Sequence, residues 1–228
     1  MSSALLPRSM QAWTFSSKGL PRDVLTLDSS YPTPSPPAKD DLLIRVSHVG
    51  LNPGCYITMS TMPPIVRYLL SGTKRAISEG EFSGVVHLAG PSASKTFSAG
   101  TLVFGCLPMM TLIAGAGTLA EYIVVPSSIV AMVPPCLAMV HAAGLSGAGQ
   151  TALNMFDAVN VRNGDRVLVN GGSGGVGTMV VQLAKAKGAY VIATCSSANA
   201  NMVKELGADE VSRPFLSIYQ PSVLSTDR

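Results

Sequence analysis

The pattern of apolar and polar positions divides the chain into two parts of different character. In the first part, short segments rich in β-branched, aromatic and aliphatic residues are separated by clusters of Gly, Pro and Ser, which is typical of a β-barrel or sandwich. The expected strands are 10–15, 41–50, 82–89, 101–104 and 119–125. The proline-rich segment 31–37 is expected to be a loop, because proline cannot donate to a sheet ladder.

From about residue 137 the pattern changes to alternating helices and strands. A helix is expected over 137–158 despite its glycines, followed by a strand over 165–170. From Val176 the apolar positions follow the i, i+3, i+4, i+7 stripe of an amphipathic helix, which Gly188 would cap. A strand over 189–194 and a helix over 199–206, stopped by Gly207, come next. This order predicts a parallel α/β domain.

The fold class predicted is therefore α/β plus β, with three segments along the chain. Residues 1–136 would form the β-rich domain and residues 137–211 a partial Rossmann domain, and 212–228 would be an atypical tail.

A glycine-rich stretch joins the strand over 165–170 to the following helix. Gly172, Gly174 and Gly177 have the spacing G-x-G-x-x-G within a strand–turn–helix context. Such a turn lets backbone N–H groups approach a dinucleotide pyrophosphate at the positive end of a helix. The stretch therefore predicts a dinucleotide site.

The end of the next strand indicates which dinucleotide is preferred. Sites for NAD usually present Asp or Glu about twenty residues after the glycines, where it binds the ribose 2′-hydroxyl. Here the strand ends in Ala193-Thr-Cys-Ser-Ser without an acid, and Lys204 follows on the next helix. Hydroxyl groups such as that of Ser196, together with a lysine, favour a 2′-phosphate and hence NADPH.

The same turn also fits a second signature. Residues 171–175 read G-x-S-x-G, the nucleophile elbow of α/β-hydrolases, with Ser173 as the nucleophile. That mechanism needs an acid and a histidine later in the chain, but the three histidines, His48, His87 and His141, all precede Ser173. A hydrolase therefore remains a minor alternative.

Composition excludes several other classes of function. Charged residues make up 13% of the chain, and the net charge of +3 is scattered, which argues against nucleic-acid binding. Only Glu121 is charged between residues 101 and 156, yet glycines and prolines interrupt this apolar stretch too often for a membrane span. The four cysteines show no metal-type spacing, so no metal site is expected. Free thiols and the lack of a secretory signal pattern favour a reducing, cytoplasmic location.

Several motifs in sequence order resemble the zinc-independent, quinone-oxidoreductase-like branch of the medium-chain dehydrogenase/reductases. They are Asn52-Pro-Gly-Cys-Tyr56, Gly80-Glu-Phe-Ser-Gly84, Gly117-Thr-Leu-Ala-Glu-Tyr122, the stretches 142–152 and 170–177, and Glu205-Leu-Gly-Ala-Asp209. The resemblance implies a GroES-like barrel followed by a Rossmann domain, with NADPH in the cleft between them. It also implies hydride transfer to a quinone or an α,β-unsaturated carbonyl.

The resemblance assigns roles to individual residues. Asn52 and Tyr56 match residues that face the nicotinamide and the substrate, although a turn residue before Pro53 and a half-buried core aromatic are the alternative interpretations. The matched cofactor contacts are Thr151 near the nicotinamide, and Ser173, Gly175, Val176 and Ser196 at the phosphates and adenosine ribose. The family often has Asp where this chain has Cys55, for which a packed free thiol is favoured over a nucleophile.

The resemblance is expected to end after Val211, before the Rossmann sheet is complete. The strand preceding the glycine turn, normally central, would then be an edge with unpaired backbone groups. Two hypotheses follow. The protein is either an NADPH-dependent oxidoreductase with weak or absent activity, or a non-catalytic fragment that acts, if at all, by pairing with a second chain, for example as a homodimer.

Overall fold

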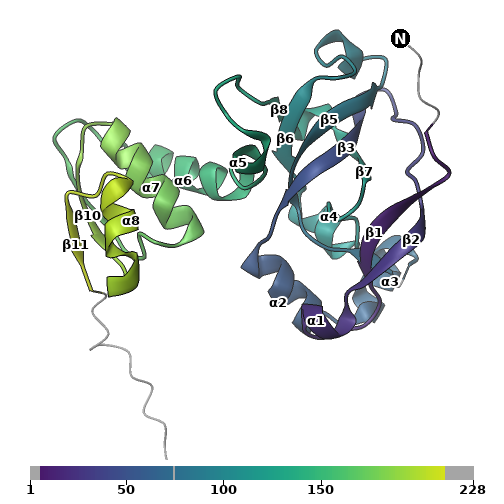
Figure 1. Cartoon of the computed structure of the whole chain (residues 1–228), viewed down its shortest axis with the longest axis horizontal. Coiled ribbons are helices and arrows are strands. Elements are labelled where there is room, and N and C mark those ends of the chain that lie inside the picture. Colours follow the sequence, from purple (N-terminus) through teal and green to yellow (C-terminus); the bar gives the residue numbers. More distant parts are fainter. Residues whose placement is uncertain (1–5, 74, 214–228) are drawn as a thin grey trace, which may run out of the picture. The chain divides into compact units, whose positions relative to one another are not determined.

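The chain forms two compact units, Met1–Gly147 and Ala148–Arg228, in a computed structural model that describes residues 6–73 and 75–213 (Figure 1). The division falls further along the chain than the boundary expected after residue 136. Helix α5 (Met139–Ala143) explains the difference, because it contacts β3, β5 and β6 of the first unit. The expected tail lies outside the described residues from position 214 onward.

The first unit contains two antiparallel sheets. The larger has the order β7-β3-β5-β6-β8 and the smaller the order β2-β1-β4. In the larger sheet the bounds are β3 Asp41–Gly50, β5 Glu81–Ala89, β6 Leu102–Cys106, β7 Tyr122–Pro126 and β8 Val130–Met132; in the smaller they are β1 Ser9–Phe15, β2 Thr26–Pro32 and β4 Ala76–Ile77. This arrangement confirms the expected GroES-like β domain and all five expected strands, with shifts of a few residues at their ends.

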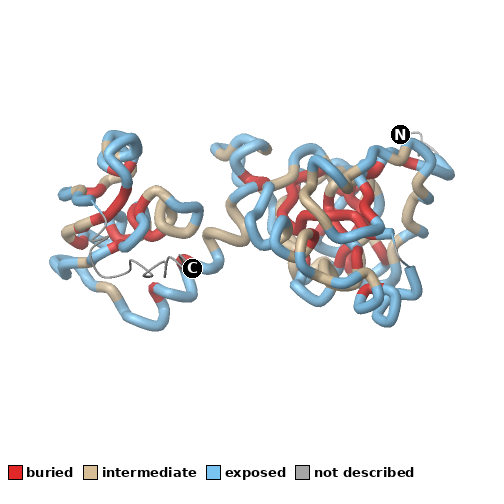
Figure 2. Tube along the Cα trace, turned by 90° about the horizontal axis from the view of Figure 1, so that it is seen from below, coloured by how far each residue is buried: buried red, intermediate tan, exposed pale blue. Residues whose placement is uncertain are grey.

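The core of the first unit lies on one face of the larger sheet. Leu42, Ile44, Phe82, Val103 and Val125 come from four neighbouring strands and are completely buried. Figure 2 shows this buried centre as red segments inside an exposed outer layer. The packed strands form a firm base from which the loop and helix that follow β3 project.

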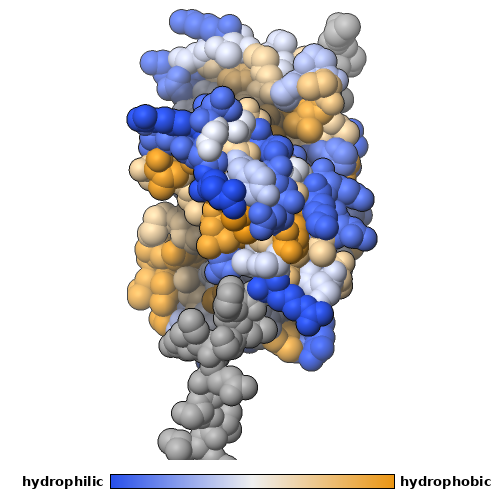
Figure 3. All heavy atoms as spheres, turned by 90° about the vertical axis from the view of Figure 1, so that its left-hand side faces the viewer, coloured by the Kyte–Doolittle hydropathy of each residue, from blue (hydrophilic) through white to orange (hydrophobic). Residues whose placement is uncertain are grey.

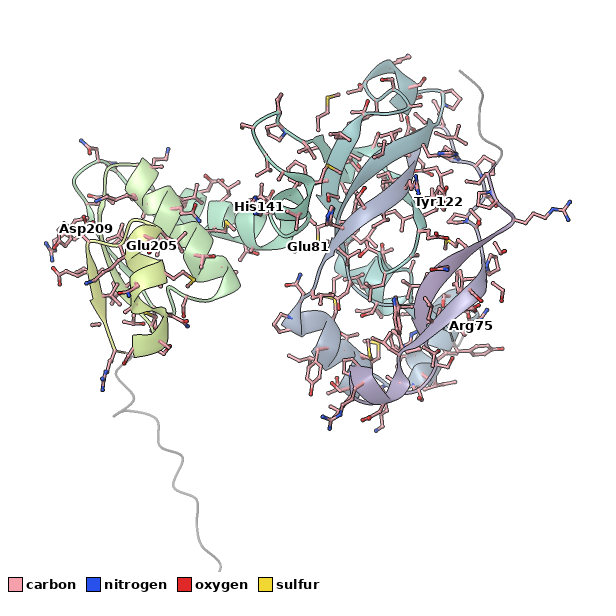
Figure 4. The ribbon with its side chains drawn as sticks, in the orientation of Figure 1. Arg75, Glu81, Tyr122, His141, Glu205 and Asp209 are labelled. Carbon is pink, nitrogen blue, oxygen red and sulfur yellow. The ribbon has the colours of Figure 1, made fainter. Side chains whose placement is uncertain are left out.

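The expected loop at 31–37 is partly wrong. Tyr31 and Pro32 are the last residues of β2 and pair with Met10 and Ser9 of β1. Proline is tolerated there because β2 is an edge strand, so the missing N–H faces no partner strand. The guanidinium of Arg75, which is labelled in Figure 4, lies 5.2 Å from the centre of the Tyr31 ring and further holds this end of β2.

Short helices in the first unit were not predicted. They are α1 Pro21–Val24, α2 Pro53–Thr61, α3 Pro64–Ser71 and α4 Met109–Ile113, with 3₁₀ turns at Ala93–Lys95 and Ser127–Ile129. Three of them begin with a proline, whose fixed φ and missing N–H suit the first helical position. This local signal was available in the sequence at Pro53 and Pro64.

The single helix expected over 137–158 is two helices. Helix α5 ends at Gly144, and α6 (Ser146–Val159) begins two residues later. Glycine is a poor helix former, so the break occurs where the sequence offers the least support for a continuous helix. Ala142 and Ala143 are buried against the first unit, whereas Ala152 and Phe156 pack in the core of the second.

The second unit is a parallel three-stranded sheet with helices packed against it. The order is β11-β10-β9, which is the order 3-2-1 of a Rossmann half. The elements are β9 Arg166–Val169, α7 Gly175–Ala186, β10 Tyr190–Thr194, a 3₁₀ turn at Ser197–Asn199, α8 Ala200–Glu205 and β11 Glu210–Ser212. Gly188 and Gly207 follow α7 and α8 with φ of +79° and +112°, as their predicted capping roles require. The partial Rossmann domain is confirmed.

Within residues 6–73 and 75–213, β9 has a strand partner on one side only. Leu168 on this edge is 67% exposed, and Met155 and Val159 of α6 are also exposed. These side chains line a hollow of about 470 Å³ beside β9. On the face drawn in Figure 3, hydrophobic side chains likewise appear in patches between hydrophilic ones. No helix in the described part of the chain is both long and apolar enough to cross a membrane.

Candidate cofactor and active-site residues

The glycine turn after β9 is held in place by Thr194 at the end of β10. The backbone N–H of Gly172 donates to the Thr194 carbonyl at 2.8 Å, and that of Gly171 donates to the Thr194 hydroxyl oxygen at 3.0 Å. The Thr194 hydroxyl in turn donates to Oδ1 of Asn170 at 2.7 Å. Gly171 has a φ of +78°, which lets the chain turn sharply from the strand. The turn is thus rigid before any ligand arrives.

Each glycine of the predicted fingerprint has a distinct steric environment. A Cβ atom on Gly172 would lie 2.9 Å from the Cβ of Ala193, and one on Gly177 would lie 2.1 Å from the Gly171 carbonyl oxygen. These two positions allow the helix and both strands to approach closely. Gly174 and Gly175 are exposed, and a Cβ on Gly175 would meet nothing within 4 Å. Gly174 and Gly175 therefore leave the turn accessible to a ligand.

Helix α7 begins directly at this exposed surface. Gly174 is its N-cap and makes no side-chain capping bond, and Gly175, Val176 and Gly177 form its first turn. The first N–H groups of a helix have no intrahelical acceptor and carry the positive end of the helix dipole. The predicted contacts Ser173, Gly175 and Val176 are brought together here. The arrangement fits an anionic phosphate group.

The end of β10 carries the other predicted nucleotide contacts. Thr194 and Cys195 are buried, and Ser196 is exposed just beyond the strand. No Asp or Glu lies between Ala189 and Lys204. Lys204 lies in the last turn of α8, at the far end of that helix from Ser196, beside Glu205 (Figure 4). Ser196 therefore follows the strand whose Thr194 bonds to the turn, and the nucleotide contacts of Ser196 and Lys204 stay predictions.

Thr151 lies on α6 and is exposed, next to the buried Ala152. It is on a different element from the glycine turn, and its contact with the nicotinamide end of the cofactor stays a prediction. For Ser173 as a hydrolase nucleophile, the second unit offers no partner, since all three histidines precede it in the first.

In the first unit, Asn52 and Tyr56 lie one turn apart on α2. Asn52 is the N-cap and Tyr56 the fourth residue of the helix. Both are exposed, Tyr56 to 45%. This exposure is compatible with a half-buried aromatic as well as with a substrate contact, so the role of Tyr56 stays a prediction. Asn52 makes no side-chain capping bond, which leaves its carboxamide available to a ligand.

The carboxylates of Glu79 and Glu81 interact with the thiols of Cys55, on α2, and Cys106, on β6. Glu79 and Glu81 are 8% and 4% exposed, and Glu81 is the strand neighbour of Cys106 on β6 and of Gly50 on β3. Glu81 accepts a hydrogen bond from the backbone N–H of Gly147, and its place at the start of β5 is labelled in Figure 4. Sequence reasoning missed these carboxylates; the pair of acids within an apolar stretch at 76–86 was the available signal.

This cluster sets the state of Cys55. Burial, followed by the charge of Glu79, raises the pKa of the Cys55 thiol to about 12. Burial likewise raises the pKa of Glu79 and, together with Glu81, that of Cys106. A thiol that stays protonated at neutral pH is a poor nucleophile. Cys55 is a free thiol, as are Cys106, Cys136 and Cys195.

Comparison with known proteins agrees with these observations. Residues 38–135 match the family model of the alcohol dehydrogenase GroES-like domain, and residues 175–220 match that of the zinc-binding dehydrogenases. Despite this second name, no group of three or more His, Cys, Asp and Glu side chains in the described part of the chain is placed to hold a metal ion.

The similar proteins are reductases. A trans-enoyl reductase of Penicillium oxalicum is 31% identical over 89% of this chain and 60% of its own length. The quinone oxidoreductase of Coxiella burnetii has a solved structure that matches with a TM-score of 0.78 and 32% identity, covering 90% of this chain and 62% of its own. A mycobacterial protein solved in complex with NADPH matches with a TM-score of 0.70 and 31% identity, covering 90% of this chain and 58% of its own.

Fold and matches together define a GroES-like domain followed by part of a nicotinamide-dependent dehydrogenase domain. Over most of its length the chain is similar to medium-chain dehydrogenase/reductases, and the matched relatives include enoyl reductases and quinone oxidoreductases. It spans about 60% of the length of the relatives it matches.

Proposed function

We propose that this protein is an NADPH-dependent reductase that transfers hydride to an α,β-unsaturated carbonyl compound or to a quinone. The observation that carries the proposal is the rigid glycine turn with the uncapped start of α7 beside it. The family supports a nicotinamide cofactor, and the names of the relatives support both substrate classes.

The preference for NADPH rests on the end of β10. An acid there would hydrogen-bond the ribose of NADH and repel a 2′-phosphate. This chain presents the exposed hydroxyl of Ser196 instead. The mycobacterial relative solved with NADPH is consistent with the same choice.

Two residues of α2 are proposed to act on the substrate. When bound, NADPH supplies a hydride, which forms a new C–H bond at the β-carbon of an enone while charge develops on the carbonyl oxygen. The carboxamide of Asn52 and the hydroxyl of Tyr56 are hydrogen-bond donors that could stabilise this oxygen. Their placement at the N-cap and in the first turn of the same helix keeps both residues close together.

Turnover of candidate substrates tests the proposal. We expect the purified protein to oxidise NADPH when an enone or a quinone is added, as followed by the loss of NADPH absorbance. Removal of a donor, in Asn52→Ala or Tyr56→Phe, should lower kcat by about 10²-fold. Tyr68→Phe on α3 is the matched control, because Tyr68 is equally exposed and is assigned no role. NADPH oxidation that is unaffected by either variant would exclude the proposed roles.

The open edge of β9 favours a second candidate function. A strand edge that has no partner among residues 6–73 and 75–213, and that carries the exposed Leu168, is a template for pairing with another chain. Under this hypothesis the protein is non-catalytic, the glycine turn binds NADPH weakly or not at all, and association, for example as a homodimer, is the relevant property. The four free cysteines fit the cytoplasmic location proposed for either function.

A further inference from the structure

Glu79 occupies an unusual backbone conformation at the entrance to β5. Its φ is +66°, and among the described residues other than glycine only Asn160 shares a positive φ. A left-handed conformation is costly for a residue with a long side chain and persists only when its surroundings hold it. Its side chain is almost fully buried, so the conformation directs a carboxylate inward.

The buried carboxylate reaches the first turn of α2. Oε2 of Glu79 accepts a hydrogen bond from the backbone N–H of Asn52 at 2.9 Å. The carboxylate also interacts with the thiol of Cys55, the third residue of the helix. A negative charge at a helix N-terminus is stabilising, and here it accepts from the N–H of the N-cap residue itself, the bond that the Glu or Gln of a capping box makes.

The side chain of Asn52 does not play the usual role of an N-cap asparagine. Asparagine at this position ordinarily turns its side-chain oxygen back onto the N–H groups of the helix. Here that bond is absent while Glu79 holds the Asn52 backbone, and Asn52 is exposed one turn before Tyr56.

We infer that Glu79 is a positioning residue, whose carboxylate caps α2 by holding the backbone N–H of Asn52 and so orients the Asn52 and Tyr56 side chains for the substrate. The part of this inference that concerns the substrate rests on the proposed reductase function. Capping by Glu79 is a property of the first unit alone and can be measured without a cofactor.

The groups around Glu79 define its electrostatic surroundings. The Ser78 hydroxyl lies 3.5 Å from Oε1 of Glu79. The negative charge of Glu81 contributes to the raised pKa of Glu79. Cys106 faces Glu81 across β5 and β6. Glu79 contributes to the raised pKa of Cys55 but not to that of Cys106. The reactivity of Cys106 is therefore an internal reference for that of Cys55 when Glu79 is substituted.

The experiment compares Glu79→Gln and Glu79→Gly with the unaltered protein. Glu79→Gln keeps the shape and one acceptor oxygen, whereas Glu79→Gly removes the side chain and relieves the positive φ. We expect hydrogen exchange of the Asn52 amide to become faster in Glu79→Gly and to change less in Glu79→Gln. Alkylation of Cys55 by iodoacetamide at mildly alkaline pH, resolved by peptide mass spectrometry, should increase in both variants relative to Cys106.

Steady-state kinetics of the same variants then distinguish a positioning role of Glu79 from a purely structural one. We expect kcat to fall by about 10- to 100-fold in Glu79→Gly with partial recovery in Glu79→Gln, while the Kd for NADPH stays unchanged. Unaltered Asn52 exchange and Cys55 alkylation would overturn the inference. So would altered exchange with an unaltered kcat. If the unaltered protein shows no turnover, the proposed function fails, and the exchange and alkylation results still decide whether Glu79 caps α2.

Discussion

Gly177 lies so close to Gly171 that a Cβ atom would stand 2.1 Å from the carbonyl oxygen of the preceding turn. The contact joins the first turn of α7 to the turn that follows β9, and it is made by backbone atoms that cannot move aside. The geometry of the candidate phosphate site thus depends on a position where no side chain fits.

Gly177→Ala should therefore destabilise the protein by about 1–3 kcal/mol, because an added methyl group forces the backbone to shift. The measurement is the free energy of unfolding in urea. Gly175→Ala is the control, since its Cβ points into open space and no loss of stability is expected. Equal stability of the two variants would show that α7 does not approach the turn as described.

Ser196→Asp should change the cofactor preference. The new carboxylate would repel a 2′-phosphate and could hydrogen-bond the ribose of NADH, as acids at this position do in NAD-dependent proteins. We expect the Kd for NADPH to increase by about tenfold or more, which corresponds to about 1.4 kcal/mol, while NADH binding is unchanged or improved. Ser98→Asp, exposed in the first unit, controls for the added charge alone. A uniform change for both cofactors would argue against a ribose contact at Ser196.

The raised pKa of Glu79 predicts how its contribution to stability varies with pH. Because burial raises the pKa in the folded state above the ordinary value of 4.5, the folded protein binds the proton more tightly than the unfolded chain. The contribution of Glu79 is therefore fully present below 4.5 and declines as pH rises through the folded-state pKa. Glu79→Gln removes this titration, so its stability relative to the unaltered protein should rise between acidic and neutral pH. Unfolding curves over that range measure the difference, and a constant difference would contradict the raised pKa.

Self-association, if it occurs through β9, should depend on Leu168. A charged side chain on an exposed strand edge disfavours edge-to-edge pairing. We expect Leu168→Lys to lower the apparent molecular mass in concentration-dependent size-exclusion chromatography, while Leu27→Lys on β2, also an exposed leucine, leaves it unchanged. A monomer at all concentrations in the unaltered protein would remove the second candidate function.

Local patterns predicted much of the fold but little of the contact network behind the site. The ten residues of β3 were predicted with correct ends, since a long apolar segment flanked by turn residues is unambiguous. The glycine turn was predicted for the same reason: its spacing is local. By contrast, Glu79 and Asn52 are 27 positions apart, and their hydrogen bond depends on a left-handed residue that no propensity indicates.

Other positions show similar limits of sequence reasoning. Lys204 was assigned to the 2′-phosphate by proximity in sequence, and it lies in the last turn of α8. Its assignment, like those of Thr151 and Ser196, stays a prediction. The helices α2 and α3 were overlooked because apolar runs interrupted by prolines suggest loops until the proline is placed at the first helical position.

The most direct test of the account is a fluorescence titration of the purified protein with NADPH, with NADH in parallel and with Gly175→Asp as the matched variant. A negative charge at the start of α7 meets no steric obstacle in the structure but would repel a phosphate. The account predicts saturable binding that favours NADPH and is lost in Gly175→Asp. Absence of binding by the folded, unaltered protein, or binding that Gly175→Asp leaves intact, would contradict the central claim that this turn holds the cofactor.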